Sequence, residues 1–403
     1  MTGKIHREAE APREPAAEVA AVCALACVPG VGAGALARIA QAFGSMEGAL
    51  QAGPEALAAK AAELKLQRRT SEFLARRPDL EKLGAWAMST ARAAGARILT
   101  LADPSYPPLL RRIENPPPVL YVRGELAGDA KRVALVGARA ADEAALQLSR
   151  ALAEELAIAG VEVVSGGARG VDAEAHAGAL WGGGRTVAVL GTGIDVPYPP
   201  ENGALFERIA ADGGALVSEL PPGTPASRPN FPRRNRTIAG LSHAIVVVRA
   251  TAESGALITA RHAAAQGRAI FAVPGDRGDA LAAGPHLLLS AGSAAPVTCA
   301  REILELLGWA VPGQLAARAS AVPPSGALAE PASTVPPAGQ ALEGPALRVW
   351  ELLDGRRPVH VDVLATRAQL GPHEALRWLT ELELKGLIHQ TPGKYFLRSR
   401  GSS

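Results

Sequence analysis

The chain has 403 residues and carries 42 Lys and Arg against 39 Asp and Glu, a formal net charge of +3. This length allows two or three domains of about 150 residues, and 48% hydrophobic with 20% charged residues excludes a disordered chain. Only 4% of the residues are aromatic, which excludes a surface that holds nucleic acid by many stacked rings, so any such binding must use charges and main-chain amides.

The N-terminal residues 1–15 have the composition of a disordered tail. An apolar run follows at 19–28, but Lys4, Arg7 and Arg13 ahead of it are balanced by three glutamates, so the positive region of an export signal is missing. No other apolar stretch reaches the roughly 18 residues of a membrane span. Three cysteines are too few for a disulfide framework. These features predict a cytoplasmic protein with no membrane segment.

From 16 to 80 the chain is rich in Ala and Leu and is predicted to be helical, with a glycine-rich turn at 29–34. A helix, a tight glycine turn and a second helix at 35–43 form a helix-hairpin-helix pattern, typical of a SAM-like domain. The glycines either let main-chain amides approach a phosphate or only permit close packing of the two helices. The spacing leaves both interpretations open.

The segment 81–129 contains several clustered prolines and is predicted to be an extended connector. From 130 to 309 short β-branched runs alternate with amphipathic helices. This alternation predicts an α/β domain, a Rossmann-like, doubly wound, mostly parallel sheet covered on both faces. The predicted strands are 133–137, 161–165, 186–191, 215–219, 244–248, 269–273 and 296–299.

Composition changes again at 310–345, where prolines predict a flexible linker. Residues 346–398 then show three helical segments, at 347–353, 361–367 and 372–385, followed by a hairpin. Three helices and a hairpin predict a C-terminal winged helix.

Ligands of an open α/β sheet bind at the carboxyl ends of its strands, in the crevice where the strand order reverses. The loops predicted there are 137–139, 165–172 and 191–193, and a longer fourth loop that ends at 228–236. Three of the four contain arginine, and all contain glycine or lead into a helix start. Glycine allows close approach of the main chain, helix starts offer free N–H groups and guanidinium groups match phosphate oxygens. The loops therefore predict a phosphate-binding edge.

The segment 220–252 concentrates positive charge in an otherwise near-neutral domain. It contains no acid and five arginines, which are Arg228, Arg233, Arg234, Arg236 and Arg249. A solvated face usually mixes signs, so this segregation favours contact with a phosphate backbone. Phe231 lies inside the cluster and is a candidate either to stack on one base or to anchor the loop inward.

The sequence offers little for catalysis. No GxGxxG fingerprint and no P-loop is found, which argues against a nicotinamide-dependent dehydrogenase and a P-loop ATPase. Asp172 and His176 have the i,i+4 spacing of metal ligands, but no third ligand is near in sequence, so Asp172 is expected to cap or orient its helix and glycine loop. No serine elbow or carboxylate pair stands out. We predict no catalytic residue, no metal and no cofactor.

Six stretches of the α/β region resemble the DNA-processing protein A (DprA, also called Smf) family, in the same order and at similar spacing. They are VALVGAR at 133–139, SGGARGVDAEAHAGAL at 165–180, VAVLGTGIDVPYPPE at 187–201, NFPRRNRTIAGL at 230–241, SGALITAR at 254–261 and FAVPG at 271–275. The helix-hairpin-helix segment, the connector and the winged helix resemble the family more weakly. The resemblance implies a non-enzymatic, homodimeric protein that pairs through its Rossmann-like domain and binds single-stranded DNA. It also implies that the protein protects incoming DNA and loads the RecA recombinase during natural transformation and homologous recombination.

By its position, Arg139 corresponds to the arginine of the family's Gly-Ser-Arg motif. In this chain Ala138 stands in place of the serine. Arg169 with Gly170 corresponds to the Ala-Arg-Gly motif, and Arg228 with Phe231 to the basic and aromatic pair of the DNA pocket. A short stretch at 276–285 replaces a longer polar loop of the family. The candidate DNA-binding residues are Gly137, Arg139, Ser165, Gly166, Arg169, Gly170, Arg228, Asn230, Phe231, Arg233, Arg234, Asn235, Arg236 and Gly255.

Two other functions fit parts of the sequence. The same Rossmann-like superfamily includes nucleotide phosphoribohydrolases, but their Pro-Gly-Gly-x-Gly-Thr-x-x-Glu loop is replaced here by 252–257, without the matching acid. The other alternative is a nucleotide-sensing regulator whose winged helix reads duplex DNA. Against it, the charges of the presumed recognition helix at 372–385 are too balanced for a helix that faces phosphates.

Overall fold

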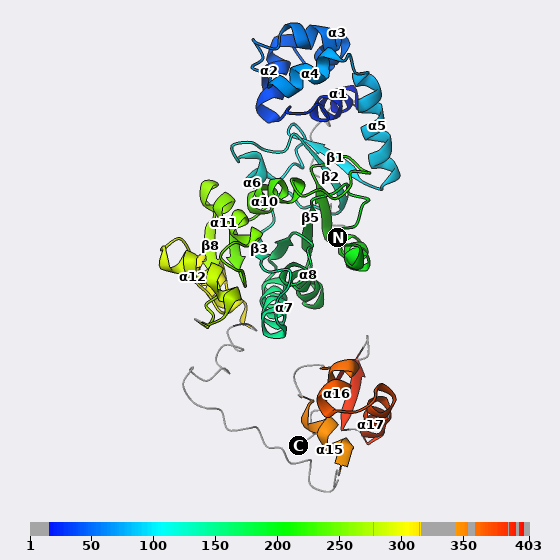
Figure 1. Cartoon of the computed structure of the whole chain (residues 1–403), viewed down its shortest axis with the longest axis vertical. Coiled ribbons are helices and arrows are strands. Elements are labelled where there is room, and N and C mark those ends of the chain that lie inside the picture. Colours follow the sequence, from blue (N-terminus) through cyan, green and yellow to red (C-terminus); the bar gives the residue numbers. More distant parts are fainter. Residues whose placement is uncertain are drawn as a thin grey trace, which may run out of the picture. The chain divides into compact units, whose positions relative to one another are not determined.

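The computed structural model describes residues 16–276, 278–313, 315, 344–353, 359–385, 387–391 and 395–398. The predicted tail at 1–15 and most of the predicted linker at 310–345 lie outside these residues. The chain forms two compact units, 1–321 and 322–403 (Figure 1). Among the described helices, none is both long and apolar enough to cross a membrane.

Helices build the N-terminal part of the first unit. They are α1 (Ala16–Ala26), α2 (Ala33–Phe43), α3 (Met46–Ala59), α4 (Arg68–Ala75) and α5 (Leu80–Ala93). α3 begins at a capped turn, because the Ser45 hydroxyl accepts the Gly48 N–H at 2.9 Å and the Glu18 carboxylate accepts the N–H groups of Met46 and Glu47. The apolar faces of these helices share one core with one end of the sheet.

The first unit contains a sheet of nine strands, in the order β1-β2-β6-β5-β4-β3-β7-β8-β9. From β6 to β9 neighbouring strands are parallel, whereas β1 and β2 pair antiparallel. The strands are β1 (Arg97–Thr100), β2 (Val119–Gly124), β3 (Arg132–Val136), β4 (Glu162–Ser165), β5 (Thr186–Leu190), β6 (Ala215–Ser218), β7 (Ala244–Val247), β8 (Ala269–Ala272) and β9 (Ala295–Pro296).

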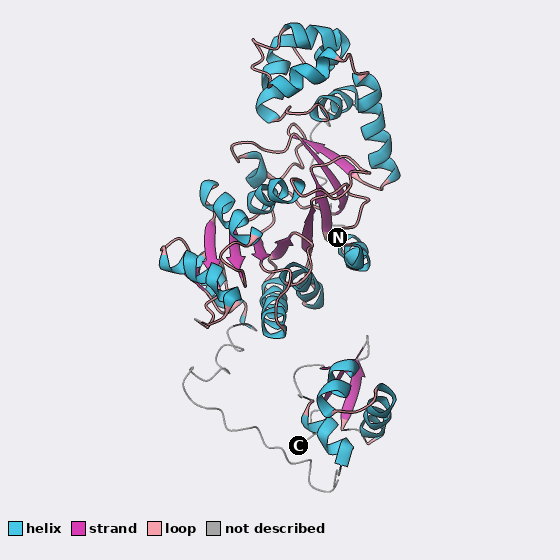
Figure 2. Ribbon diagram, in the orientation of Figure 1, coloured by secondary structure: helices cyan, strands magenta, loops and turns pink. Residues whose placement is uncertain are grey.

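Helices cover both faces of this sheet (Figure 2). Along β3, Val133 and Leu135 face the core under α7 (Glu143–Ile158) and α8 (Val171–Trp181). Ala134 and Val136 face the opposite core, which is completed by α6, α10 and α11. This period-2 alternation with both faces buried confirms the predicted doubly wound α/β fold. The remaining helices of the unit are α6 (Pro108–Arg111), η1 (Pro200–Asn202), α9 (Gly203–Ala211), α10 (Asn230–Leu241), α11 (Gly255–Ala265), η2 (Ala280–Ala282), α12 (Ala283–Ser290) and α13 (Ala300–Leu306).

The prediction of an extended connector at 81–129 is wrong. This segment contains most of α5 and also β1 and β2, which continue the sheet beyond β6, with Tyr121 opposite Ser218. The prolines precede β2 rather than interrupt it, so the strand Val119–Gly124, whose first four residues are buried, is free to pair. The segment is therefore part of the α/β unit.

The second unit has the elements expected of a winged helix. Its core gathers Val349, Trp350, Leu364, Leu379 and Phe396. A three-stranded antiparallel sheet lies beside the helices, in the order β10-β12-β11. The elements are α15 (Gly344–Glu351), β10 (Val359–His360), α16 (Val361–Ala368), α17 (Pro372–Leu384), β11 (Ile388–Thr391) and β12 (Tyr395–Arg398).

Candidate nucleic-acid interface

A pocket of about 370 Å³ opens at the carboxyl ends of β3, β4 and β5. Its walls come from the loops that follow these strands and from the first turn of α10. The residues that line it are Arg139, Gly166, Ala168, Arg169, Tyr198, Pro199, Phe231 and Arg234. The edge of the sheet is thus the one that the sequence predicts.

The expected crevice at the reversal of strand order, between β3 and β7, is closed by main chain. The Ala138 N–H donates to the Arg249 carbonyl at 2.7 Å, and a Cβ on Gly137 would come within 2.7 Å of the same oxygen. Gly170, whose φ is +74°, passes equally close to the Ala138 carbonyl. These two glycines therefore let loops pack together, and the pocket lies over β4 and β5 instead.

Two arginines stand at the rim of the pocket. Arg139 is exposed, and its guanidinium carbon lies 5.5 Å from the centroid of the Phe231 ring. Arg169 is also exposed, but it forms an ion pair with Glu201, which raises the pKa of Arg169 and lowers that of Glu201. No ion pair involves Arg139 in the described part of the chain. Arg139 is therefore available for a phosphate, whereas Arg169 must first leave Glu201.

The aromatic wall of the pocket contains two rings. Phe231 is half-buried and packs on the main chain of Gly191, where a Cβ would come within 2.7 Å of the ring. Tyr198 is 42% exposed, and its ring centroid lies 5.4 Å from that of Phe231. Phe231 thus anchors its loop and also lines the pocket. Tyr198 is not among the predicted site residues, although a rare aromatic between two prolines after a strand is a usable signal.

Arg234 is buried, although the sequence predicts that it lies on an exposed basic surface. Its side chain is buried, and Nη1 donates to the carbonyls of Gly166 and Val189. Burial lowers the pKa of Arg234 to about 10, although the nearby Asp172 carboxylate raises it. This buried guanidinium holds neighbouring loops together at the floor of the pocket, which it also lines.

Two main-chain N–H groups of the glycine loop at 165–172 are already hydrogen-bonded within the loop. The Asp172 carboxylate accepts the N–H groups of Gly166 at 3.2 Å and Ala168 at 3.3 Å, which confirms that Asp172 orients this loop. Burial raises the pKa of Asp172, while Arg234 lowers it. The Ser165 hydroxyl is fully buried and donates to the Leu135 carbonyl at 2.7 Å. Ser165 is therefore also revised, from a DNA contact to a support of the pocket.

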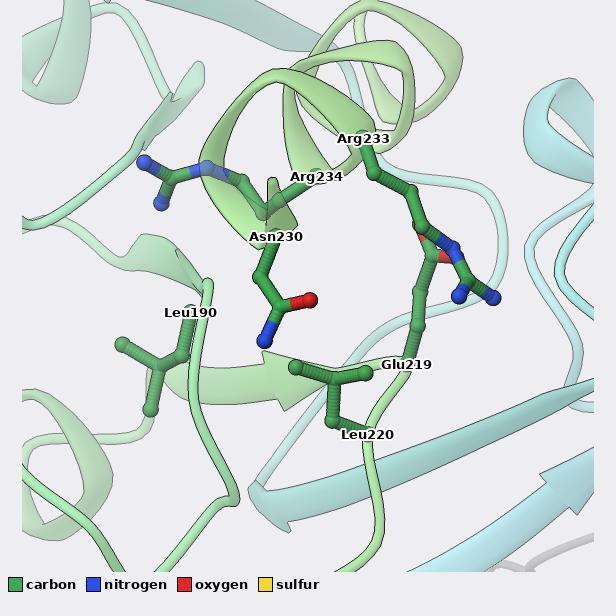
Figure 3. A pocket seen from close by; sticks show the side chains of 6 residues that line it. All are labelled: Leu190, Glu219, Leu220, Asn230, Arg233 and Arg234. Carbon is green, nitrogen blue, oxygen red and sulfur yellow. The ribbon is translucent and has the colours of Figure 1, made fainter. Parts of the chain in front are cut away.

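The arginines on either side of Arg234 are opposed by an acid just outside the acid-free segment. The Glu219 side chain is buried, accepts a hydrogen bond from Arg236 Nη2 at 2.6 Å and lies 3.5 Å from Arg233 Nε. In Figure 3, Arg233 runs alongside Glu219, while Arg234 extends to the opposite side of α10. The predicted unopposed basic stripe is therefore wrong, because a carboxylate one residue ahead of it neutralises part of its charge.

Other members of the stripe differ in environment. Arg249 lies 3.5 Å from Asp279, whereas Arg228 is exposed in the loop before α10 and has no ion pair among the described residues. Asn235 donates to the Gly255 carbonyl at 3.3 Å, and Gly255 itself is exposed with open space around it. Asn230 lies between Leu190 and Leu220 in a smaller hollow of about 180 Å³ (Figure 3).

His176 lies below the site as a neutral, buried ring. Its Nδ1 is 2.7 Å from the Thr186 hydroxyl, which itself donates to the Val163 carbonyl, so the proton of the neutral imidazole is on Nδ1. Nε2 has no hydrogen-bond partner among the described residues. Burial, aided by Arg234, lowers the pKa of His176 to about 3.

We expect the free energy of unfolding to fall as pH drops below 6.5, because the unfolded chain protonates His176 and the folded one does not. With a folded pKa of about 3, the loss at pH 5 is about 2 kcal/mol. Urea unfolding between pH 7.5 and 5 measures it. The His176→Asn variant, which keeps a donor towards Thr186, should lose this dependence, and an identical pH dependence in both proteins would contradict the assignment.

Comparison with known proteins gives a consistent result. The family model described as DNA recombination-mediator protein A matches residues 97–308, and that of the DprA winged helix domain matches 332–394. Protein Smf of Synechocystis sp. is 41% identical over 252 residues, 61% of this chain and 62% of that protein, so the match spans less than two thirds of that relative. Protein Smf of Escherichia coli is 40% identical over 293 residues, 72% of this chain and 74% of that protein.

A solved structure is also similar. The X-ray structure of DNA processing protein A (DprA) from Streptococcus pneumoniae gives a TM-score of 0.59 at 28% identity, and the match covers 73% of this chain and 98% of that one. The similarity expected from the sequence motifs is confirmed.

Proposed function

Because the chain belongs to the DNA recombination-mediator protein A family, we propose that it is a non-enzymatic mediator that binds single-stranded DNA through the pocket at β3, β4 and β5. The observation that carries this proposal is the exposed Arg139 beside the Phe231 ring at the pocket rim, which pairs with no acid among the described residues. A guanidinium next to an aromatic face is suited to one nucleotide, because the charge attracts the phosphate and the ring contacts the base.

The pocket suits a single strand better than a duplex. Phe231 and Tyr198 reach only a base that is unstacked, and the faces of duplex bases are covered by their neighbours. Arg139, and Arg169 after release from Glu201, would contact the flanking phosphates.

The hydrolase alternative has nothing in its favour at this site. None of the residues that line the pocket is a carboxylate, and the Glu201 carboxylate beside it is held in an ion pair with Arg169.

On the family resemblance, we further propose that the protein acts in the cytoplasm during natural transformation and homologous recombination. There it would protect incoming strands, load RecA and form a homodimer through the Rossmann-like domain. We also propose a winged-helix domain at 346–398, preceded by a linker. The linker begins after Leu315 and not at the predicted residue 310, because Leu315 is buried in the core of the first unit. The division of the chain between residues 321 and 322 supports two separate domains.

Fluorescence anisotropy with a labelled oligonucleotide tests the proposed binding. We expect the full chain to bind single-stranded DNA, with a log–log salt slope of about −0.7 for each phosphate contact. Two or three contacts therefore imply about a tenfold loss of affinity between 50 and 200 mM salt. Binding that is absent, or unchanged across this range, would contradict the proposal.

A further inference from the structure

Three stretches of the chain that contain no acid lie side by side in the first unit. They are 104–113, which includes α6, 220–252, which includes α10, and 254–275, which includes α11. α10 packs against both α6 and α11 (Figure 1). Together the stretches contain nine arginines, four of them outside 220–252. The fold therefore gathers more positive charge on this face than any one segment carries.

Side-chain contacts join the stretches into one surface that begins at the pocket. Phe231 lines the pocket, and two residues further along α10 the exposed Arg233 lies beside Glu219 (Figure 3). Nearly one turn later, Arg236 Nη2 donates to the Glu219 carboxylate and its Nη1 donates to the Asn115 carbonyl. The outer side of α10 thus leads from the pocket towards α6.

α11 continues this surface on the other side of α10. The side-chain amide of Gln266 donates to the Arg236 carbonyl at 3.1 Å. Burial lowers the pKa of His262, and Arg236 and Arg261 lower it further, while a hydrogen bond with the Pro232 main chain raises it. The guanidinium groups of Arg236 and Arg261 therefore both lie near His262.

The surface ends at the amino edge of the sheet, where Arg268 precedes β8. Arg268 Nη2 donates to the Leu109 carbonyl of α6 at 2.9 Å. Burial lowers the pKa of Arg268, and the nearby Arg112 lowers it further. Two like charges held close to each other favour an anion beside them. We call the following five arginines the basic track: Arg233, Arg236, Arg261, Arg268 and Arg112.

Three of the five charges of the basic track have no counter-ion. The two arginines of α10 share one carboxylate, that of Glu219. Arg112 and Arg261 are exposed, and neither they nor Arg268 form an ion pair with any described residue. The exposed Glu114, two residues from Arg112, is not paired with it. The track therefore offers cations to an anionic partner.

The basic track offers no ring on which a base could stack. The three stretches contain three aromatic residues, of which Phe231 belongs to the pocket. The other two, Tyr106 and Phe271, are buried. Arginines without exposed rings contact the phosphates of a nucleic acid rather than its bases.

We propose that the basic track binds the phosphates of the same single strand whose base occupies the pocket. One strand fits because the surface is continuous, since α10 supplies both Phe231 and the start of the track. The 12 residues of α10 span about 18 Å at about 1.5 Å each, which corresponds to about five nucleotides spaced about 3.4 Å apart. This inference rests on the proposed function and adds to it the length of strand that is bound.

The test compares a 4-nucleotide with a 20-nucleotide oligothymidylate, both labelled, in anisotropy titrations of the full chain. In the variant Arg112→Ala/Arg261→Ala we expect affinity for the longer strand to fall at least fivefold. Affinity for the shorter strand, which covers the pocket alone, should change less than twofold. Each variant is compared with the wild type at the same length, so the larger number of registers on the longer strand cancels.

The salt dependence gives a second readout. For the longer strand, the log–log salt slope of the track variant should become shallower by about 1.4, which is two contacts at about 0.7 each. The melting temperature should stay within a few degrees of the wild type, because both side chains are exposed and form no ion pair in the described chain.

The matched control is Arg92→Ala/Arg97→Ala. It removes the same charge from two exposed arginines outside the three stretches and breaks no described ion pair. Both affinities should remain within twofold of the wild type. An unchanged affinity of the track variant for the longer strand, an equal loss in the control, or an equal loss for the shorter strand would overturn the proposal.

The pocket variant Arg139→Ala separates this proposal from the proposed function. It should weaken binding of both lengths, because Arg139 lines the pocket that each strand occupies. If the wild type binds neither strand, or if Arg139→Ala changes neither affinity, the proposed function is wrong and the basic track with it. If Arg139→Ala weakens both and the track variant weakens neither, only the basic track is wrong.

Discussion

Replacing Arg234 with alanine is expected to lower the free energy of unfolding by about 3–5 kcal/mol, the largest effect that we predict for a single substitution. The guanidinium is buried and donates to the carbonyls of Gly166 and Val189. Its removal leaves both acceptors without their donor and leaves the buried carboxylate of Asp172 without a compensating charge. Urea unfolding followed by circular dichroism measures the loss.

The neighbouring Arg233 provides a matched control. Its side chain is 54% exposed and lies 3.5 Å from Glu219, so Arg233→Ala should change stability by less than about 1 kcal/mol. If the two variants unfold at the same urea concentration, the supporting role of Arg234 is wrong. If Arg234→Ala stays folded and loses only DNA binding, Arg234 is a ligand contact after all.

Replacing Arg139 with alanine is expected to weaken single-strand binding by about 10- to 100-fold, which corresponds to the roughly 1.5–3 kcal/mol of a hydrogen bond to a charged group. Arg139 is exposed, lines the pocket and forms no ion pair within the described chain. Arg169→Ala should have a smaller effect, because a DNA phosphate must displace Glu201 before it gains Arg169. The salt slope should become shallower by about 0.7 for each arginine removed.

Anisotropy titrations of both variants measure this order. Arg208→Ala is the control, since Arg208 is exposed on α9, lies 3.5 Å from Asp212 and does not line the pocket. Equal, small losses in all three variants would mean that binding depends on net charge rather than on the pocket. Melting temperatures should remain within a few degrees of the wild type, which separates lost contacts from lost structure.

Much of the fold follows from local patterns in the sequence. The alternation along Val133–Val136, buried on both faces, predicts a central strand, and every strand predicted between 130 and 309 appears in the sheet. By contrast, β2 was missed because its strand character depends on pairing with β6, far along the chain, while the prolines before it suggested an irregular connector. Long-range pairing of this kind leaves little local signal.

The sequence predicts where the site lies but not which of its side chains are accessible. The four loops were found because parallel strands bring their carboxyl ends to one edge. The sequence predicts the same DNA contact for every arginine at the start of α10. Successive helical residues, however, point about 100° apart. Arg234 consequently turns into the floor of the pocket while Arg233 turns to Glu219.

By itself, the sequence determines the family, the doubly wound sheet, the winged helix and the edge where the pocket forms, because hydrophobic period, glycine position and motif order are local properties. Only the tertiary structure decides which arginines remain available. Glu201, Glu219 and Asp279 each lie close to an arginine from another segment, and Asp172 lies under Arg234. An ion pair depends on distance in space and not along the chain. Among the described residues, Arg139 is the arginine of the pocket rim that forms no ion pair.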